Sequence, residues 1–205
     1  CIQVHGSFNF EGGYMKEEII KTLKDLLSFK TYEENKDEFE KLFNYIKKNY
    51  SNYLITEYKF KDKKALVLSN TDSHDLDIIM CTHIDIVHAD TYDFTEDKDN
   101  IYGRGTIDMK ASVAVCLTLL KNIKTDLSIA LFITSDEEID GNCANELSKI
   151  YNSMIAIVPD GGSNFDLISE EKGLIQLKLS TKTKPAHSAK LFEGVNAILK
   201  LMDVY

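Results

Sequence analysis

The sequence predicts an α/β domain with a largely parallel sheet. Three observations support this fold class: two amphipathic helical segments open the chain, apolar strand-like runs follow them, and strand-like and helical segments then alternate. Such an alternation is typical of a layered domain in which helices connect parallel strands.

The two opening segments have the apolar spacing of helices. KEEIIKTLKDLLSF (16–29) places five apolar side chains on one helical face, and DEFEKLFNYIKKNY (37–50) places four there. We therefore expect two amphipathic helices before the first strand.

The later elements follow in chain order. The run LDIIMCTH (76–83) is apolar almost throughout, as a central strand covered on both faces would be. A polar stretch covers residues 89–100, and a helix is expected from Asp108 onward. The remaining predicted elements are strands at 53–60, 64–69, 127–134 and 154–160, and a helix near 142–150.

The pattern changes near residue 170. EKGLIQLKLST (171–181) alternates apolar and polar residues like a half-exposed strand, and GVNAILKLMDVY (194–205) has helical spacing. We therefore expect a first domain over 15–170 and the start of a second one over 171–205. Residues 1–14 precede the helix that we expect to open at Met15, and we interpret them as a tag or non-native leader.

The composition argues against several kinds of partner. The chain has 24 Lys and Arg against 33 Asp and Glu, and its net charge of −9 disfavours binding to nucleic acid or to an anionic membrane. No apolar run approaches the ~18 residues of a transmembrane helix. The four cysteines form no CxxC pair, so we expect buried free thiols and a cytoplasmic, reducing compartment.

Side chains that can bind metal occur at four places where an apolar strand ends or a helix begins. They are His83 and Asp85 in MCTHIDIV, Asp108 in GRGTIDMK, Glu137 and Glu138 in SDEEIDG, and Asp160 in IVPDGG. If the strands are parallel, all four segments converge on the crevice at the carboxyl ends of the strands. Histidine and carboxylates without cysteine favour Zn²⁺, Co²⁺ or Mn²⁺.

The spacing of these residues suggests a division of roles. Residues i and i+2 of a strand lie on one side, so Asp85 can reach His83 and orient its ring. In the adjacent pair Glu137 and Glu138, one carboxylate can bind metal while the other acts as a base, and the chemistry leaves open which does which.

Each motif also has a simpler interpretation. An HxD pair is commonly an ordinary strand feature, and an acidic run is commonly a solvated loop. Asp108 could cap its helix, and Asp160 could belong to a turn. The joint interpretation is stronger because four independent segments supply ligands in order.

These residues lie in motifs that resemble a known family. CTHIDIV, YGRGTIDMKAS, TSDEEIDG, VPDGG and EKGLIQLKLSTKTKPAHSA occur in the order found in di-zinc exopeptidases and deacylases. This family includes acetylornithine deacetylase, succinyl-diaminopimelate desuccinylase, aminoacylase-1, carboxypeptidase G2 and bacterial dipeptidases. The resemblance covers residues about 80–198.

The resemblance implies a metal-binding role for four residues. His83 and Asp160 would bind one zinc ion, Glu138 would bind the second, and Asp108 would bridge both.

The resemblance implies a catalytic role for three further residues. Glu137 would be the general base, Asp85 would orient the ligand histidine, and His187 in PAHSA would polarise the substrate carbonyl from a lid. Asn196 in GVNAI would assist the substrate or the lid, or would lie on a helix surface.

The implied fold is a three-layer zinc-peptidase-like catalytic domain, followed by the beginning of an α+β lid and dimerisation domain. The implied function is hydrolysis of the amide bond of an N-acyl amino acid or small peptide by a hydroxide that bridges two zinc ions, in a homodimer. Family members are longer and take their last zinc ligand from a histidine near their C-terminus, so the resemblance implies that this chain is truncated. Two alternatives stay open: a catalytically incompetent fragment of such an enzyme, and a different two-metal hydrolase such as a phosphoesterase.

Overall fold

The structure is a computed structural model. It describes residues 12–161, 168–170, 172–173, 175, 177–187 and 189–203. The chain divides into two compact units, Cys1–Gly161 and Gly162–Tyr205, and each is described by itself. Residues 1–11 of the expected leader lie outside the described residues. The predicted boundaries of the leader and of the domain at 15–170 stay predictions.

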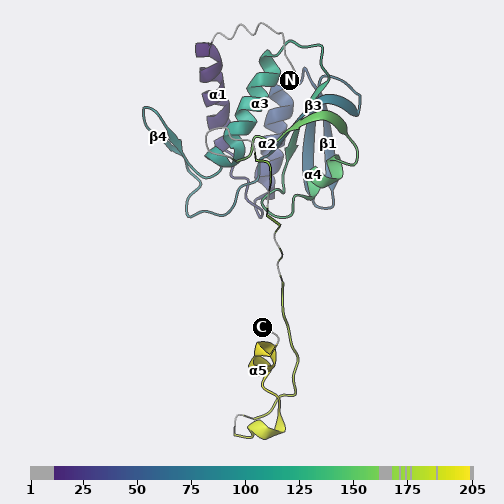
Figure 1. The fold of residues 1–205 in the computed structure, drawn as a ribbon. Helices are drawn as coiled ribbons and strands as arrows, with labels where there is room; N and C mark the ends of the chain where they lie inside the picture. The colour runs from purple at the N-terminus through teal and green to yellow at the C-terminus, as the bar shows by residue number, and fades with distance from the viewer. Residues whose placement is uncertain are drawn as a thin grey trace. The chain divides into compact units, whose positions relative to one another are not determined.

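The first unit contains the predicted helices and strands in the predicted order (Figure 1). Its helices are α1 (Gly12–Leu27), α2 (Lys36–Asn49), α3 (Ala111–Asn122) and α4 (Asn142–Leu147). Its strands are β1 (Leu54–Phe60), β2 (Lys63–Ser69), β3 (Asp75–His83), β4 (Thr95–Glu96), β5 (Ile101–Tyr102), β6 (Ile129–Thr134) and β7 (Asn152–Ile157).

Three local features differ from the sequence prediction. Helix α1 begins at Gly12 and not at Met15. The polar stretch 89–100 contains β4, which pairs antiparallel with β5 in a small separate hairpin. The helix expected from Asp108 becomes regular only at Ala111, because the backbone at Asp108 and Met109 departs from helical dihedral angles.

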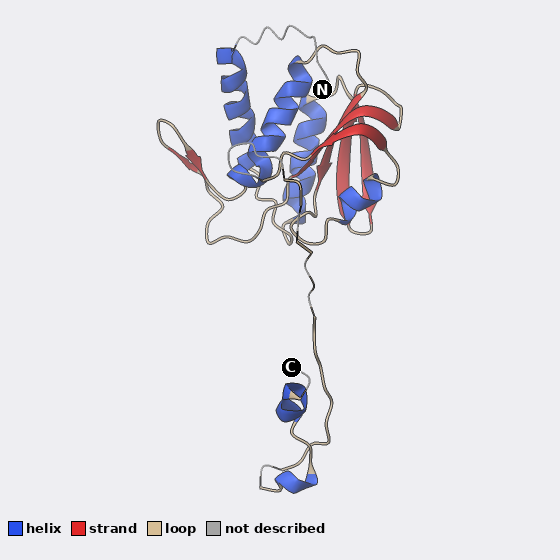
Figure 2. Cartoon of the chain, in the orientation of Figure 1, coloured by secondary structure: helices blue, strands red, loops and turns tan. Residues whose placement is uncertain are grey.

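The main sheet, whose strands are drawn in red in Figure 2, has the strand order β1-β2-β6-β3-β7. Strand β3 pairs parallel with both β6 and β7, whereas β2 pairs antiparallel with both β1 and β6. Four of the five strands therefore run in one direction, and the prediction of a mostly parallel sheet is confirmed.

The side chains of β6 show how the sheet separates two helical layers. Ile129, Leu131 and Ile133 belong to the core cluster that includes residues of α1, α2 and α3. Ala130 and Phe132 point to the opposite face and belong to a second cluster with residues of α4. Alternate strand residues therefore bury both faces of the sheet, which makes a three-layer α/β/α arrangement.

The second unit contains one helix of more than one turn among its described residues, α5 (Ala197–Met202). The Oδ1 atom of Asn196 accepts hydrogen bonds from the backbone N–H groups of Ile198 and Leu199, which caps this helix. The described residues of the predicted strand at 171–181 form no strand, because a strand requires a backbone partner and none of them is paired. Residues 204–205 of the predicted helix lie outside the described residues.

Across the described helices of both units, none combines the length and the apolar composition that crossing a membrane requires.

Candidate metal centre

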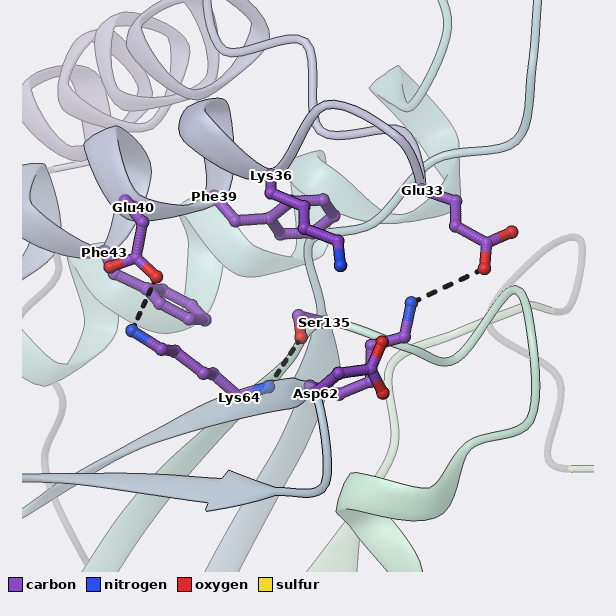
Figure 3. A pocket seen from close by; sticks show the side chains of 9 residues that line it. Glu33, Lys36, Phe39, Glu40, Phe43, Asp62, Lys64 and Ser135 are labelled. Carbon is purple, nitrogen blue, oxygen red and sulfur yellow. Dashed lines mark hydrogen bonds and ion pairs between the residues drawn. The ribbon is translucent and has the colours of Figure 1, made fainter.

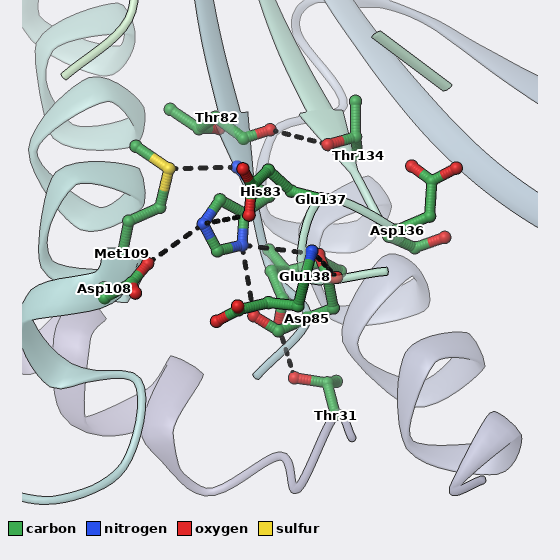
Figure 4. A network of polar contacts seen from close by, with 12 residues as sticks. Thr31, Thr82, His83, Asp85, Asp108, Met109, Thr134, Asp136, Glu137 and Glu138 are labelled. Carbon is green, nitrogen blue, oxygen red and sulfur yellow. Dashed lines mark hydrogen bonds and ion pairs between the residues drawn. The ribbon is translucent and has the colours of Figure 1, made fainter. Parts of the chain in front are cut away.

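Three neighbouring parallel strands bring the predicted ligands to one edge of the sheet. His83 is the last residue of β3, Glu137 and Glu138 follow β6, and Asp160 follows β7. Since β6, β3 and β7 are adjacent and parallel, their carboxyl ends meet at this edge. Asp108 arrives from the turn before α3, and this turn is tied to β3 because the backbone N–H of His83 donates to Sδ of the neighbouring Met109 over 3.2 Å (Figure 4).

Carboxylates from three of these segments surround one nitrogen of His83. Its Nε2 lies 3.1 Å from Oδ1 of Asp108, 3.4 Å from Oδ2 of Asp160 and 3.8 Å from Oε2 of Glu137. The histidine is only 1% exposed, whereas the side chain of Asp108 is 62% exposed. The cluster therefore has a buried imidazole at its base and carboxylates that reach toward solvent.

Asp85 lies on the other side of the ring. The Nδ1 atom of His83 lies 3.1 Å from the backbone oxygen of Asp85 and 3.3 Å from its Oδ1. A proton on Nδ1 can be donated to these oxygens, which leaves Nε2 free to bind a metal. The Oδ2 atom of Asp85 accepts the backbone N–H of Glu138 over 2.9 Å, so this carboxylate connects the two motifs.

The electrostatics of the cluster favour a bound cation. Burial raises the pKa of Glu137, and nearby Asp160, Asp85 and Asp108 raise it further, while His83 opposes them. Burial also raises the pKa of Glu138 and of Asp160. Several carboxylates held this close together repel one another, and a divalent ion between them would relieve that repulsion.

The neighbouring carboxylates raise the pKa of His83 as well, whereas burial acts on it in the opposite direction. Burial lowers its pKa, but the hydrogen bond and the charge of Asp85, together with the charges of Asp160 and Glu137, outweigh burial and raise it to about 9. A positive charge is thus stabilised at the position where a metal ion would contact Nε2.

The donor atoms fit a divalent metal. Two groups of three residues, His83 with Asp108 and Glu138, and His83 with Glu137 and Asp160, each offer ligand atoms that all lie within 4.8 Å of one another. One imidazole nitrogen and carboxylate oxygens suit Zn²⁺, Co²⁺ or Mn²⁺. The geometry brings both glutamates within reach, so the assignment of Glu138 as ligand and Glu137 as base stays a prediction.

His187 belongs to the second unit and is exposed. Its Nδ1 accepts the backbone N–H of Ala189 over 3.2 Å. Its predicted role toward the substrate carbonyl stays a prediction.

Asp136 has a structural role that the sequence analysis did not find. It is fully buried, its carboxylate accepts the backbone N–H of Cys143, and its carbonyl accepts the N–H groups of three residues, 139–141. It closes the turn that carries both glutamates and caps α4. No capping pattern signalled this role, because Asp136 reaches a residue seven positions ahead across a closed turn.

Two further buried polar residues next to the site escaped the sequence analysis, Thr31 and Lys110. Thr31 lies between α1 and α2 and contacts the segment after His83 (Figure 4). Lys110 is 1% exposed, and burial, with a smaller effect of Lys30, lowers its pKa to about 7. The only sequence signal for Lys110 was its place in the motif YGRGTIDMKAS.

Two hollows lie near the turn after β6. One, of about 150 Å³, borders Asp85 and Glu138 and is lined also by Glu33, Ile86, Val87, His88 and Ile139. The other, between α2 and the β1–β2 turn, contains lysines that pair with acidic residues: Lys64 with Glu40 and Lys63 with Glu33 (Figure 3). Only the first hollow adjoins the metal-binding side chains, so it offers space for a ligand next to them.

Proteins with assigned names resemble this chain in sequence. The chain is 27% identical over 212 residues to a probable succinyl-diaminopimelate desuccinylase of Staphylococcus aureus, covering 94% of this chain and 51% of the relative. It is 29% identical to a LysW-lysine/LysW-ornithine hydrolase of Saccharolobus solfataricus, covering 93% of this chain and 54% of that protein. The chain thus spans about half the length of the curated relatives it matches.

Solved structures share the fold. A tripeptidase of Staphylococcus aureus matches with a TM-score of 0.62 and 17% identity, over 92% of this chain and 55% of that one. An M20 family metallo-carboxypeptidase of Sulfolobus solfataricus matches with a TM-score of 0.57 and 17% identity, over 71% of this chain and 38% of that one.

The sequence profile of peptidase family M20/M25/M40 matches residues 79–183, which is just over half of the chain and includes His83, Asp108, both glutamates and Asp160. The chain therefore belongs to peptidase family M20/M25/M40.

Proposed function

We propose that the protein that carries this chain is a metal-dependent hydrolase that cleaves the amide bond of an N-acyl amino acid or a small peptide. The observation that carries the proposal is the convergence of carboxylates on the buried Nε2 of His83, at the carboxyl edge of three parallel strands in a member of this family. The activities printed in the names of similar proteins, desuccinylase, hydrolase and peptidase, support this class of reaction.

In this proposal four residues hold the metal: His83, Asp108, Glu138 and Asp160. Zn²⁺ is the metal that we expect, two per complete active site, with Co²⁺ or Mn²⁺ as substitutes. The bound metal would polarise the scissile carbonyl and lower the pKa of water toward neutrality. The backbone oxygen of Asp85 accepts the Nδ1 proton of His83, its carboxylate lies 3.3 Å from the same nitrogen, and together they keep Nε2 directed at the metal.

Glu137 is the proposed general base and acid. Its side chain is 52% exposed, so it can reach a water molecule above the buried histidine. It takes one proton as the water oxygen bonds to the carbonyl carbon, and it returns that proton to the nitrogen as the C–N bond breaks. The products are a carboxylic acid and an amine, and at neutral pH the acid gives its proton to the amine or to solvent. We assign polarisation of the carbonyl oxygen to His187, in line with the sequence resemblance.

The proposal also covers the setting of the enzyme. We expect a small-molecule substrate, no nucleic acid or membrane partner, and a homodimer. We expect a cytoplasmic location, and the described cysteines Cys81, Cys116 and Cys143, which are free thiols, support it.

The test uses the longest form of the protein that carries this chain. Zinc content and the hydrolysis of N-acyl amino acids and dipeptides are measured for the wild type, Glu137→Gln and Glu138→Gln. We expect Glu137→Gln to retain zinc and lose about 10²- to 10⁴-fold in kcat, the usual contribution of a general base. Glu138→Gln should lose zinc as well as activity. Turnover that survives Glu137→Ala would overturn the mechanism, and a wild type without zinc would overturn the metal assignment.

A further inference from the structure

Residues 26–35, the end of α1 together with the segment that leads to α2, are called the α1–α2 connection below, and this connection contacts both of the turns that bring carboxylates to opposite sides of His83. The turn after β3 carries Asp85, and the turn before α3 carries Asp108. These turns are separated by more than 20 residues of chain, yet each bonds to this connection through a nearly fully buried polar side chain. The connection itself supplies none of the proposed ligands.

Thr31 holds the first turn. It is 0% exposed, its hydroxyl donates to the carbonyl of Ile84, and its own carbonyl accepts the N–H of Ile86 over 3.0 Å (Figure 4). These two bonds reach the backbone immediately before and after Asp85. They therefore fix the peptide that positions the Asp85 carboxylate against His83.

Lys110 holds the second turn. Its Nζ donates to the carbonyl of Phe29 over 2.7 Å and to that of Leu26 over 3.3 Å, at the C-terminal end of α1. A cation is favourable at this end of a helix, where carbonyl groups lack helical partners. Lys110 lies two residues after Asp108, so the bond sets the distance of the Asp108 turn from α1.

A separate set of contacts joins the connection to the loop beyond Asp85. The Nζ atom of Lys30 donates to the carbonyl of Tyr92 over 2.6 Å and pairs with Asp93 over 2.8 Å. The rings of Tyr32 and Tyr92 stack with their centroids 4.6 Å apart. These contacts hold the connection in place without involving the proposed ligands. The connection can therefore position both turns.

We propose that Thr31 and Lys110 are positioning residues that preorganise the metal site: together they hold the Asp85 turn and the Asp108 turn at a set spacing on the α1–α2 connection. The inference rests on the proposed function, since it assumes that Asp108 binds the metal and that Asp85 orients the ligand His83. Ligands must be held within about 0.5 Å of their productive positions, and loss of an outer partner typically weakens metal binding about 10- to 100-fold.

The experiment measures the binding of metal alone to the longest form of the protein that carries this chain. Zn²⁺ affinity is determined by competition with a chelating dye, and the visible absorption of bound Co²⁺ reports the ligand geometry. Thr31→Val keeps the shape but removes the hydroxyl, and Thr31→Ser restores it; Lys110→Met removes the amine. Leu147→Ala, in α4 on the opposite face of the sheet, is the matched control for a loss of stability without a change near the site.

We expect Thr31→Val and Lys110→Met to weaken Zn²⁺ binding about 10- to 100-fold and to alter the Co²⁺ spectrum. Thr31→Ser should restore both, and Leu147→Ala should lower the melting temperature while affinity and spectrum stay at the wild-type values. If Lys110→Met does not fold, the comparison of Thr31→Val with Thr31→Ser tests the inference.

Two outcomes would overturn the inference in different ways. Wild-type affinity and spectrum in Thr31→Val, with only the melting temperature lowered, would reduce Thr31 to a structural role and refute the positioning role while leaving the proposed function standing. A wild-type chain that binds neither metal would refute the metal assignment and the positioning role together.

Discussion

Strands β6 and β7 flank β3 on its two sides, and each leads to carboxylates of the candidate metal centre. All six residues of β6 are buried, whereas five of the six residues of β7 are exposed and the sixth is half-buried. Both strands contain apolar runs, so composition does not explain the difference. Strand β6 pairs with β2 and β3 and has helices on both faces, while among the described residues β7 pairs with β3 alone.

The turns that follow the two strands also differ in the hydrogen bonds that hold them. The turn after β6 is closed by Asp136 and bonded to Asp85 through the N–H of Glu138. Near Asp160, the carbonyl of Pro159 accepts a hydrogen bond from the hydroxyl of Ser112 in α3 over 2.6 Å. Among the described residues, the Glu137 and Glu138 side of the site therefore follows a fully buried strand, whereas the Asp160 side follows a largely exposed one.

The largest expected effect compares the same substitution in the two strands. Ile133→Ala in β6 removes a fully buried side chain and should lower the free energy of unfolding by about 2–5 kcal/mol. Ile155→Ala in β7, at a residue that is 44% exposed, should cost less than about 1.5 kcal/mol. Urea unfolding monitored by circular dichroism measures both, and equal losses would contradict the comparison.

The next effect concerns the closed turn after β6. Asp136→Ala removes the cap of α4 and leaves the buried backbone N–H of Cys143 without its acceptor, so we expect a loss of about 1–3 kcal/mol. Asp140→Ala, at an exposed position of the same turn, removes only a solvent-exposed hydrogen bond from the N–H of Asn142 over 3.2 Å, so it should cost less than Asp136→Ala. Thermal unfolding of the two variants checks the difference, and a larger loss in Asp140→Ala would refute the assigned cap.

A third prediction concerns His83, which lies between the two turns. With a pKa of about 9 in the metal-free protein, the histidine is protonated at neutral pH, and a metal ion must displace that proton. Below this pKa, Zn²⁺ affinity should therefore rise with pH, by about tenfold per pH unit for this one proton. Competition titrations from about pH 6 to about pH 8 measure the slope. An affinity that does not change with pH would mean that His83 is not the ligand.

The smallest expected effect is at the contact beside Asp160. Ser112→Ala removes the hydrogen bond to the carbonyl of Pro159 and should lower stability by about 1 kcal/mol. It should also weaken Zn²⁺ binding, because Asp160 is the next residue. Ser148→Ala removes a similar hydroxyl-to-carbonyl bond at an exposed position of α4, away from the ligands, and serves as the control. Unchanged metal affinity in Ser112→Ala would show that other contacts hold Asp160 in place.

The sequence predicted most of the fold because its signals are local. The spacing of apolar residues in 37–50 is close to the bounds of α2, and the run at 127–134 contains β6. The hairpin of β4 and β5 was missed because its strands have two residues each, too few for any periodicity. The antiparallel direction of β2 also had no local signal, since strand direction follows from pairing partners that lie more than 60 residues away in the chain.

The residues of the candidate site also divide into those with a local sequence signal and those without one. Asp108, His83, Asp160 and the pair Glu137 and Glu138 could be named as candidates from the sequence because each lies near the end of an apolar run, or where a helix opens, within a recognisable motif. Thr31 could not, because its role depends on bonds to residues 84 and 86, more than 50 positions away.

By itself, the sequence determined the type and order of the elements and the residue types available for metal binding, because periodicity and motifs are properties of short segments. Only the tertiary structure decided that the ends of β6, β3 and β7 lie side by side, and that β6 is covered on both faces while β7 is largely exposed. It also decided that Thr31 and Lys110 join two distant turns to the α1–α2 connection. These features arise from contacts between segments far apart in the chain, where burial leaves each polar group only the partners that the fold brings to it.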